Sequence, residues 1–283
     1  KGVAFWRSLT HWIGGMGVLV FVMMLTSLDD EHSMHLMRAE VPGPEADKLV
    51  PKARATARIL YLMYFVLTAA EVVFLMFGGM SFYDALLHSF STAGTGGFSN
   101  RNASVAYYDS AYIDGVITVF MILFGVNFNL YFLIRLKNWK DALKNEELHA
   151  YLGIIAGAVA IVTVNILGIY GNMRRNAFVF IGILFDRRQA SSEELLRKDA
   201  SFQVASVITT TGFCTADFNL WPELSKVVLL GIMVIGACAG STGGGIKVSR
   251  FLILVKSIKQ EVRRMLHPKA VTIVKINGKR VGY

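Results

Sequence analysis

The stretch SVITTTGFCTADF at residues 206–218 lies between two apolar segments and contains three consecutive threonines followed by a glycine and a phenylalanine. A similar stretch, STAGTGGFSN, occurs at residues 91–100. Aligning Gly97 with Gly212 needs no gap, and six of the fifteen positions from 84 to 98 are then identical. Background composition would give about one identity. The chain therefore carries two copies of one unit, and each copy contains a polar turn.

The composition favours a membrane protein. The 283 residues are 54% hydrophobic and 17% charged, whereas soluble domains carry about 25% charged residues. About 20 apolar residues cross a bilayer as one helix. Such segments are expected at 12–28, 59–80, 112–134 and 148–170, with a fifth from Pro222 past Leu254 that glycines interrupt. Two shorter stretches, 82–91 and 200–208, suit re-entrant half-helices that end at the polar turns.

Several other classes of protein are disfavoured. The two cysteines, Cys214 and Cys238, provide neither a disulfide framework nor a metal-ligand cluster, and no cofactor is expected. Acids, histidines and cysteines do not cluster at membrane depth, so no enzymatic activity is predicted. The net charge of +9 fits basic cytoplasmic loops, expected at 29–58, 135–148 and 256–283, better than a nucleic-acid surface. Lipid is therefore an expected partner and nucleic acid is not.

The polar turns have a chemistry that suits a cation. Non-helical backbone at membrane depth is tolerated only where it is buried in protein or lines water. Carbonyl and hydroxyl oxygens of such a turn can replace the hydration shell of an ion, and glycine permits the positive φ that aligns successive carbonyls. Oxygen ligands without a fixed carboxylate suit a monovalent cation better than Ca²⁺ or Mg²⁺. A plain turn between helices is the competing interpretation, and the duplication disfavours it.

Five stretches resemble the potassium-translocating subunits of the Trk/Ktr/HKT superfamily, closest to bacterial Trk. They are FWRSLTHWIGGMG at 5–17, the two polar turns, FGVNFNLYF at 124–132 and GACAGSTGGGIKVSRFL at 236–252. The resemblance implies an all-α membrane protein with tandem helix–pore-loop–helix repeats around a pseudo-fourfold cation pore. It implies K⁺ uptake across the bacterial cytoplasmic membrane, K⁺ being the transported ion. It also implies a homodimer and a cytosolic nucleotide-binding regulatory subunit at the basic face.

The resemblance further implies which residues form the selectivity filter and where the units lie. The expected ion-binding residues are Ala93, Gly94, Thr95, Gly96 and Gly97 in one unit and Thr209, Thr210, Thr211, Gly212 and Phe213 in the other. Four such units are implied: 1–28 closes the first, 29–58 is a cytoplasmic linker, 59–147 and 148–264 are the second and third, and 265–283 leads to a fourth. The chain as given then holds half of the filter.

The glycine cluster at 236–245 lies too close to Gly212 to begin another unit, so it interrupts the closing helix of the third. Each of its consecutive glycines disfavours a helix by about 1 kcal/mol relative to alanine. In the resembled superfamily such a loop lies beneath the filter and works as a gate. The resemblance therefore implies that the gate consists of Gly236, Ala237, Cys238, Ala239, Gly240, Ser241, Thr242, Gly243, Gly244 and Gly245. Close helix packing through small residues is the alternative.

The sequence also supports expectations about the mode of transport, about Glu71 and about the segment at 267–283. A K⁺-conducting pore is the favoured function, and an ion-coupled secondary transporter (K⁺ with H⁺ or Na⁺) with a broken-helix binding site is the alternative. Glu71, inside an apolar segment, is expected to face the bundle, where pairing with a hydroxyl and attracting ions are both open roles. The segment at 267–283 alternates and contains Asn277-Gly278, which predicts a short hairpin.

Overall fold

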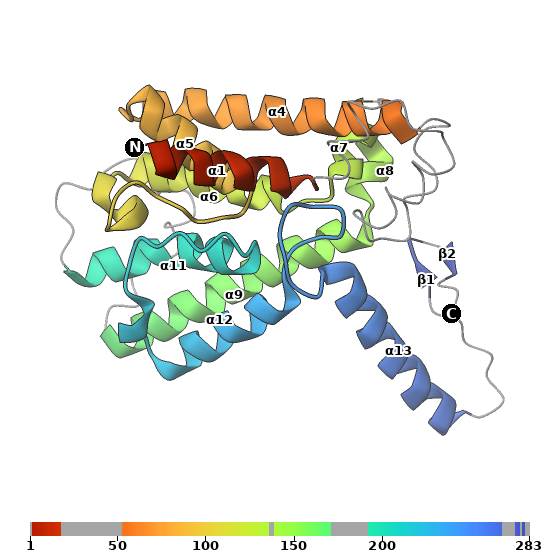
Figure 1. The fold of residues 1–283 in the computed structure, drawn as a ribbon. Helices are drawn as coiled ribbons and strands as arrows, with labels where there is room; N and C mark the ends of the chain where they lie inside the picture. Colours follow the sequence, from red (N-terminus) through yellow and green to blue (C-terminus); the bar gives the residue numbers. More distant parts are fainter. Residues whose placement is uncertain are drawn as a thin grey trace.

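A computed structural model of the chain describes residues 2–17, 53–135, 139–170, 192–267, 275–277 and 279–280. Within these ranges the protein is helical apart from one two-stranded hairpin (Figure 1). The elements are α1 (Gly2–Gly15), α4 (Ala53–Phe77), α5 (Phe82–Ala93), the 3₁₀ turn η2 (Ser104–Tyr108), α6 (Ala111–Phe124), α7 (Phe128–Arg135), α8 (Trp139–Leu143), α9 (Glu146–Tyr170), α11 (Ser192–Ile208), the 3₁₀ turn η4 (Phe218–Leu220), α12 (Glu223–Ile235), α13 (Val248–Leu266), β1 (Lys275–Ile276) and β2 (Lys279–Arg280).

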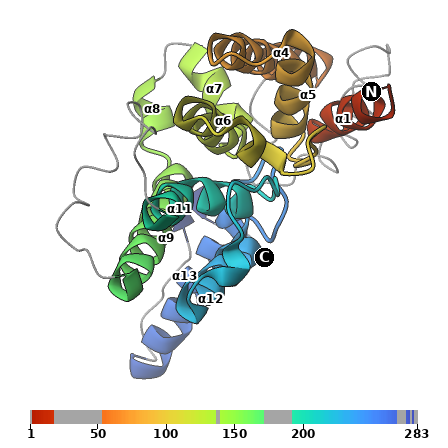
Figure 2. The same ribbon diagram turned by 90° about the vertical axis from the view of Figure 1, so that its left-hand side faces the viewer.

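The two sequence copies fold as two similar units, which are called the first and second unit from here on and correspond to the second and third of the four units that the resemblance implies. In the first, α4 is followed by α5, a polar turn and α6; in the second, α9 is followed by α11, a polar turn and α12. Helix α5 packs against α1, α4 and α6, while α11 packs against α9, α12 and α6. The contact between α6 and α11 joins the two units, which lie side by side in Figure 2.

The half-helices α5 and α11 bring the polar turns into the interior. The 12 residues of α5 extend about 18 Å, well short of a bilayer. Ser81 caps α5, because its side chain accepts the N–H of Asp84 at 3.2 Å. Helix α11 ends as expected but begins at Ser192 rather than near residue 200. Its first turns are polar, so a search for apolar segments misses them although their residues favour helix.

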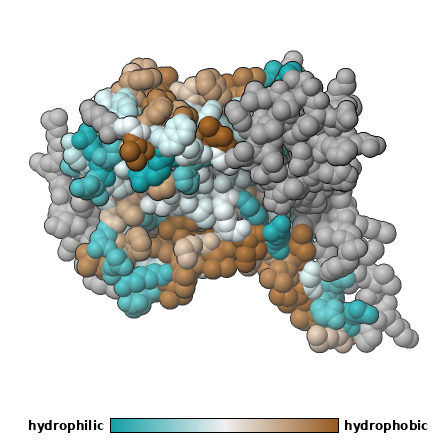
Figure 3. Space-filling model, in the orientation of Figure 1, coloured by the Kyte–Doolittle hydropathy of each residue, from teal (hydrophilic) through white to brown (hydrophobic). Residues whose placement is uncertain are grey.

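Among the described residues, two helices are long and apolar enough to cross a membrane, at Ala57–Phe77 and Glu146–Ile166, and the bent pair α6 and α7 would be a third if it is one span. Exposed apolar side chains cover the outer faces of α4 and α12, including Phe65, Phe74, Val227 and Leu230. Figure 3 shows apolar residues gathered along the lower face, where α12 lies. Such continuous apolar surfaces suit contact with lipid.

The straight helix predicted at 112–134 is wrong, because the chain bends by 86° between α6 and α7. Gly125 ends α6, and Asn127 begins the next helix by accepting the N–H of Asn129 on its Oδ1 at 2.9 Å. The bend is filled by the segment 236–247, here called the glycine-rich loop. The N–H of Phe128 donates to the Gly240 carbonyl at 3.0 Å across this bend.

Other expected boundaries have mixed outcomes. Helix α1 begins at Gly2, well before residue 12, and residues 18–28 of the expected helix lie outside the described residues. Residues 29–52 of the expected linker also lie outside the described residues. Helix α4 begins at Ala53, before residue 58, where the linker was expected to end. The interruption of the fifth segment is confirmed, since no helix covers 236–247. The hairpin is also confirmed, with Lys275 paired to Arg280 in antiparallel register.

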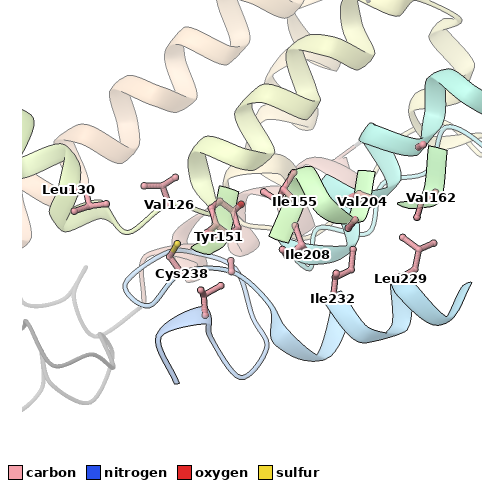
Figure 4. Close-up of a cluster of buried hydrophobic side chains, with 14 of the residues drawn as sticks. Val126, Leu130, Tyr151, Ile155, Val162, Val204, Ile208, Leu229, Ile232 and Cys238 are labelled. Carbon is pink, nitrogen blue, oxygen red and sulfur yellow. The ribbon is translucent and has the colours of Figure 1, made fainter. Parts of the chain in front are cut away.

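The second unit packs around a core shared by α9, α11 and α12 (Figure 4). Tyr151 and Val162 from α9, Ile208 from α11 and Ile232 from α12 are all buried in it. The thiol of Cys238, from the glycine-rich loop, reaches the same cluster. The loop is therefore anchored in the core of the second unit.

Candidate functional site

The polar turns at 93–97 (the first turn) and 209–213 (the second turn) have positive φ angles at two pairs of equivalent positions. Thr95 and Thr210, which occupy equivalent positions, have φ angles of 52° and 57°. Gly97 and Gly212 follow with 64° and 86°. Threonine rarely adopts a positive φ, so its occurrence at both equivalent positions extends the duplication from the sequence to the backbone.

Equivalent serines hold each turn to the end of its half-helix. The Ser91 carbonyl accepts the N–H of Gly96 at 2.8 Å, and the Ser206 carbonyl accepts the N–H of Thr211 at 2.9 Å. The hydroxyl group of each serine contacts the phenylalanine that follows the turn glycine: Ser91 contacts Phe98, and Ser206 contacts Phe213. Ser91 Oγ accepts the N–H of Phe98 at 2.5 Å, and Ser206 Oγ donates to the Phe213 carbonyl at 2.8 Å. Equivalent serines thus support both turns, with the same main-chain hydrogen bond in each and with side-chain hydrogen bonds of opposite direction.

The two turns touch at their glycines. A Cβ atom added to Gly97 would overlap the Thr211 carbonyl oxygen and lie 2.9 Å from the carbonyl carbon of Gly212. No side chain fits there, so Gly97 is required both for its φ and for the close approach of two backbones. At Gly212 nothing lies within 4 Å of the corresponding position, and only its φ favours glycine.

The hydroxyl groups of the second turn are engaged within the protein. Thr209 Oγ1 donates to the Ala205 carbonyl at 2.6 Å and lies 2.9 Å from Thr211 Oγ1. Thr210 Oγ1 donates to the Thr209 carbonyl at 2.7 Å. From the sequence, hydroxyl and carbonyl oxygens alike are expected to be ion ligands. In the structure these hydroxyls serve to hold the turn, and the carbonyls are the groups that remain.

Several backbone carbonyls of the two turns accept no hydrogen bond from the part of the chain that the structure describes. Among the described residues, no group donates a hydrogen bond to the carbonyls of Thr95, Gly96, Thr210 or Thr211. Backbone carbonyls in protein interiors are nearly always paired with a donor, a water or a ligand. The two turns therefore meet at a place where backbone carbonyls are free of described donors, and such carbonyls are groups that a cation can use as ligands.

Phe213, expected among the ion-binding residues, has a fully buried side chain. Its ring stacks on His88 of the first unit, with centroids 5.7 Å apart and planes 25° apart. The His88 ring is itself fixed, since Nδ1 lies 2.7 Å from the Asp84 carbonyl and Nε2 lies 3.0 Å from Ser99 Oγ. The side chain of Phe213 therefore supports the second turn from behind, and only its main chain can face a ligand.

An ion pair ties the start of α5 to the segment after the first turn. Asp84 accepts hydrogen bonds from Arg101 at 3.0 Å and from Asn100 Nδ2 at 2.5 Å. Burial raises the pKa of Asp84, but the hydrogen bonds from Asn100 and Arg101 outweigh burial and hold the pKa below its usual value. The carboxylate stays ionised and its charge is matched by the guanidinium, so it has a structural role.

The glycine-rich loop contacts both turns through the equivalent threonines. Thr95 Oγ1 donates to the Thr242 carbonyl at 3.1 Å, and Thr210 Oγ1 accepts the N–H of Gly244 at 2.7 Å. A Cβ atom on Gly244 would lie only 3.1 Å from Thr210 Oγ1. The backbone of the loop therefore lies directly against the ends of both turns, where the absence of side chains allows the close approach.

The loop closes on itself at its base. Gly236 and Gly245 have φ angles of 75° and 85°, and a Cβ on Gly236 would lie 2.8 Å from the Gly245 Cα. Inside the loop, Lys247 Nζ donates to the Gly243 carbonyl. These small residues form a closed loop rather than one face of a helix. Packing of a helix through small residues, the alternative for this segment, therefore does not describe its geometry.

One residue beside the loop was not predicted. Glu147 lies in the first turn of an apolar helix, where an acid usually serves only the helix start. In the structure its Oε1 accepts the N–H of Ala239, in the loop, at 2.7 Å. The one signal in the sequence is that a second acid, Glu146, precedes it and would suffice for the helix start.

Glu71 faces the bundle, as expected, and is fully buried. Neither of its carboxyl oxygens has a hydrogen-bond partner among the described residues. Thr92 lies beside it, but the Thr92 hydroxyl donates to the His88 carbonyl at 2.9 Å. A buried polar group without a partner destabilises a fold.

Replacing this carboxyl by an apolar group of similar size is therefore expected to stabilise the protein. Glu71→Met should raise the free energy of unfolding by about 1–3 kcal/mol, measured by thermal unfolding in detergent. Glu71→Gln, which keeps a buried polar group, is the control and should gain little. A Met variant that is folded but has lost ion flux would instead show that the acid attracts ions.

The chain resembles known transport proteins over nearly its whole length. The TrkH family, described as cation transport protein, matches residues 1–282. The chain is 36% identical over 279 residues to the Trk system potassium uptake protein TrkH of Escherichia coli (strain K12), covering 98% of this chain and 54% of that protein. It is 32% identical over 285 residues to the Trk system potassium uptake protein TrkG of the same strain, covering 99% and 54%.

A solved structure gives the same result. The crystal structure of the potassium transporter TrkH from Vibrio parahaemolyticus matches with a TM-score of 0.79 at 32% identity, covering 99% of this chain and 53% of that chain. The chain thus spans about half the length of the curated relatives it matches.

Proposed function

Because this chain belongs to the TrkH family of cation transport proteins, we propose that it forms part of a pore that takes up K⁺ across the bacterial inner membrane. Membership makes it a transport protein and not an enzyme, and it confirms the resemblance seen in the sequence motifs. The match to the crystal structure likewise confirms an all-α membrane fold. K⁺ is the proposed ion because the relatives are named for potassium uptake.

The observation that carries the proposal is the close approach of the two turns at Gly97 and Thr211, with backbone carbonyls on both turns that accept no described donor. The carbonyls of Thr95, Gly96, Thr210 and Thr211 accept no hydrogen bond from the described residues. Fixed carbonyl oxygens can replace the water that surrounds an alkali cation. The C-terminal, negative ends of α5 and α11 point toward the same turns and add to the attraction. We therefore assign ion binding to the backbones of 93–97 and 209–213.

The two turns account for two sides of a pore. In the proposal, residues 59–147 and 148–264 are two of four units around one axis, 1–28 belongs to another, and 265–283 leads on to a further one. Units of the same kind supply the remaining sides. This agrees with relatives of which the chain covers only 54%.

The glycine-rich loop is the proposed gate. Its backbone is hydrogen-bonded to the turns at Thr95 and Thr210, so its displacement would change the ion path at once. An inside-negative potential contributes about 2.3 kcal/mol per charge per 100 mV to cation entry. Such a pore needs no coupled ion, which favours a conducting pore over coupled transport with H⁺ or Na⁺.

The expected partners belong to the same proposal. A second copy of the chain and a cytosolic nucleotide-binding regulatory subunit are implied by the resemblance. The basic side chains of α13 would form the docking face for that subunit, and Lys259, Arg263 and Arg264 are exposed there. Exposed cations of this kind steer an acidic partner.

Ion flux through the complete gene product in liposomes tests the proposal. K⁺, Na⁺ and Li⁺ are compared, with and without imposed gradients of pH or Na⁺. We expect flux driven by the K⁺ gradient alone, with K⁺ preferred over Na⁺ and Li⁺. Flux that requires an imposed H⁺ or Na⁺ gradient would identify the coupled transporter, and absence of cation flux in every condition would reject both functions.

A further inference from the structure

Glu147 joins three elements that are far apart in the sequence. Its side chain comes from the first turn of α9 and is 6% exposed. Its Oε1 accepts the N–H of Ala239, in the glycine-rich loop, at 2.7 Å and the N–H of Ser249, in the first turn of α13, at 3.1 Å. A single carboxylate oxygen therefore holds both the loop and the helix that follows it.

Helix capping does not account for this arrangement. Asn145 already caps α9, since its Oδ1 accepts the N–H of Glu147 at 2.8 Å and the N–H of Leu148 at 3.1 Å. A buried carboxylate is costly unless it is hydrogen-bonded. The bonds that compensate Glu147 come from the main chain at 239 and 249, and bonds to a charged group are the stronger kind. The position of the loop is therefore coupled to this side chain.

The preceding residue links the same helix end to the hairpin of β1 and β2. The carboxylate of Glu146 pairs with Lys256 Nζ on α13, and that Nζ also donates to the Lys275 carbonyl at 2.8 Å. The N–H of Glu146 donates to Asn277 Oδ1 at 2.9 Å. Consecutive residues of one helical turn thus hold the hairpin on one side and the glycine-rich loop on the other.

We propose that Glu147 is a positioning residue that holds the glycine-rich loop against the two turns, and that Glu146 couples it to the hairpin. This inference rests on the proposed function of the loop as a gate. Removing the Glu147 carboxylate frees Ala239 and Ser249 together, so the loop and α13 lose their hydrogen bonds to α9 in one step, while the packing of Cys238 in the core remains. A partner that moves the hairpin would act on the loop through the same helical turn.

The test measures loop position and ion flux separately, in the complete gene product in liposomes. Cys238 is fully buried next to Ala239, so its labelling by a small membrane-permeant maleimide reports displacement of the loop. All other cysteines, including Cys214, are replaced by serine. Glu147→Leu removes both hydrogen bonds at similar size, Glu147→Asp is a milder variant with a shorter reach, and Glu147→Gln keeps an oxygen acceptor as the matched control.

In the Leu variant we expect Cys238 labelling and K⁺ flux to rise about tenfold, as the loss of a hydrogen bond to a charged group implies. The Asp variant should show a smaller rise, and the Gln variant, whose neutral amide oxygen accepts weaker hydrogen bonds, should show the smallest rise of the three. The K⁺/Na⁺ ratio should stay the same, because the turns are untouched. Asn277→Ala, which removes the hydrogen bond between the Glu146 N–H and the hairpin but leaves the link through Lys256, should raise labelling by a smaller factor than Glu147→Leu.

The outcomes separate the two proposals. Faster labelling without a change in flux would support the positioning role of Glu147 and overturn the gate. Unchanged labelling in the Asp and Leu variants would overturn the positioning role, whatever the flux. Parent-like labelling in Asn277→Ala would overturn the coupling to the hairpin.

Discussion

Gly97→Ala is expected to abolish selective K⁺ flux through the complete gene product. The added Cβ would overlap the Thr211 carbonyl oxygen, which is main chain and cannot move without displacing the second turn. The φ of 64° adds a left-handed penalty of about 1–2 kcal/mol. About 1.4 kcal/mol in a barrier changes a rate tenfold. The clash and the strain together should therefore reduce K⁺ flux by more than tenfold.

Gly212→Ala should be milder, because nothing lies within 4 Å of the new Cβ and only the φ of 86° resists it. We expect reduced flux with a lower K⁺/Na⁺ ratio, both measured in the same liposomes. Gly153→Ala, at an exposed glycine of α9 with nothing within 4 Å, is the matched control and should keep both values. If Gly97→Ala behaved like this control, the contact between the turns would not belong to the ion path.

Gly236→Ala is expected to raise K⁺ flux about tenfold in the absence of any partner, again by the relation between barrier and rate. The added Cβ would overlap the Gly244 carbonyl oxygen and lie 2.8 Å from the Gly245 Cα, so the base of the loop could not close. The displacement of Gly244 would also break its hydrogen bond to Thr210, now 2.7 Å long. The rise would be measured as K⁺ efflux from loaded liposomes.

The control for this variant lies in the helix that leads into the loop. Gly231→Ala, at an exposed position of α12 with nothing within 4 Å, should leave flux unchanged and favour the helix by about 1 kcal/mol. A folded Gly236→Ala protein with parent-like or lower flux would contradict the gate and leave the loop with a packing role.

The duplicated architecture can be predicted from the sequence because it is recorded in local patterns. Alignment of Gly97 with Gly212 identifies the two turns without a gap. The lengths of the apolar segments separate the long helices α4 and α9 from the half-helix α5. The hairpin follows from the alternation around Asn277. Each of these signals lies within a short stretch of chain.

The features that could not be predicted depend on contacts between distant residues. The bend after Gly125 is bridged by a hydrogen bond to Gly240, and nothing in the apolar periodicity of 112–134 indicates it. The hydroxyl of Thr210, expected to face an ion, accepts the N–H of Gly244 instead. From the sequence alone, Glu147 is indistinguishable from an ordinary acid at a helix start, because its hydrogen bond to the N–H of Ala239 is a long-range contact. Composition and periodicity carry no information about such partners.

The glycine-rich loop follows the second unit in the chain, yet it is fastened to both. The N–H of Cys238 donates to the Gly125 carbonyl of the first unit at 3.1 Å, while the N–H of Gly244 reaches Thr210 of the second. The halves of this duplication have therefore ceased to be interchangeable modules. Removing or exchanging either unit would leave polar groups of the glycine-rich loop without their hydrogen-bond partners. The two units should therefore unfold together in one cooperative transition.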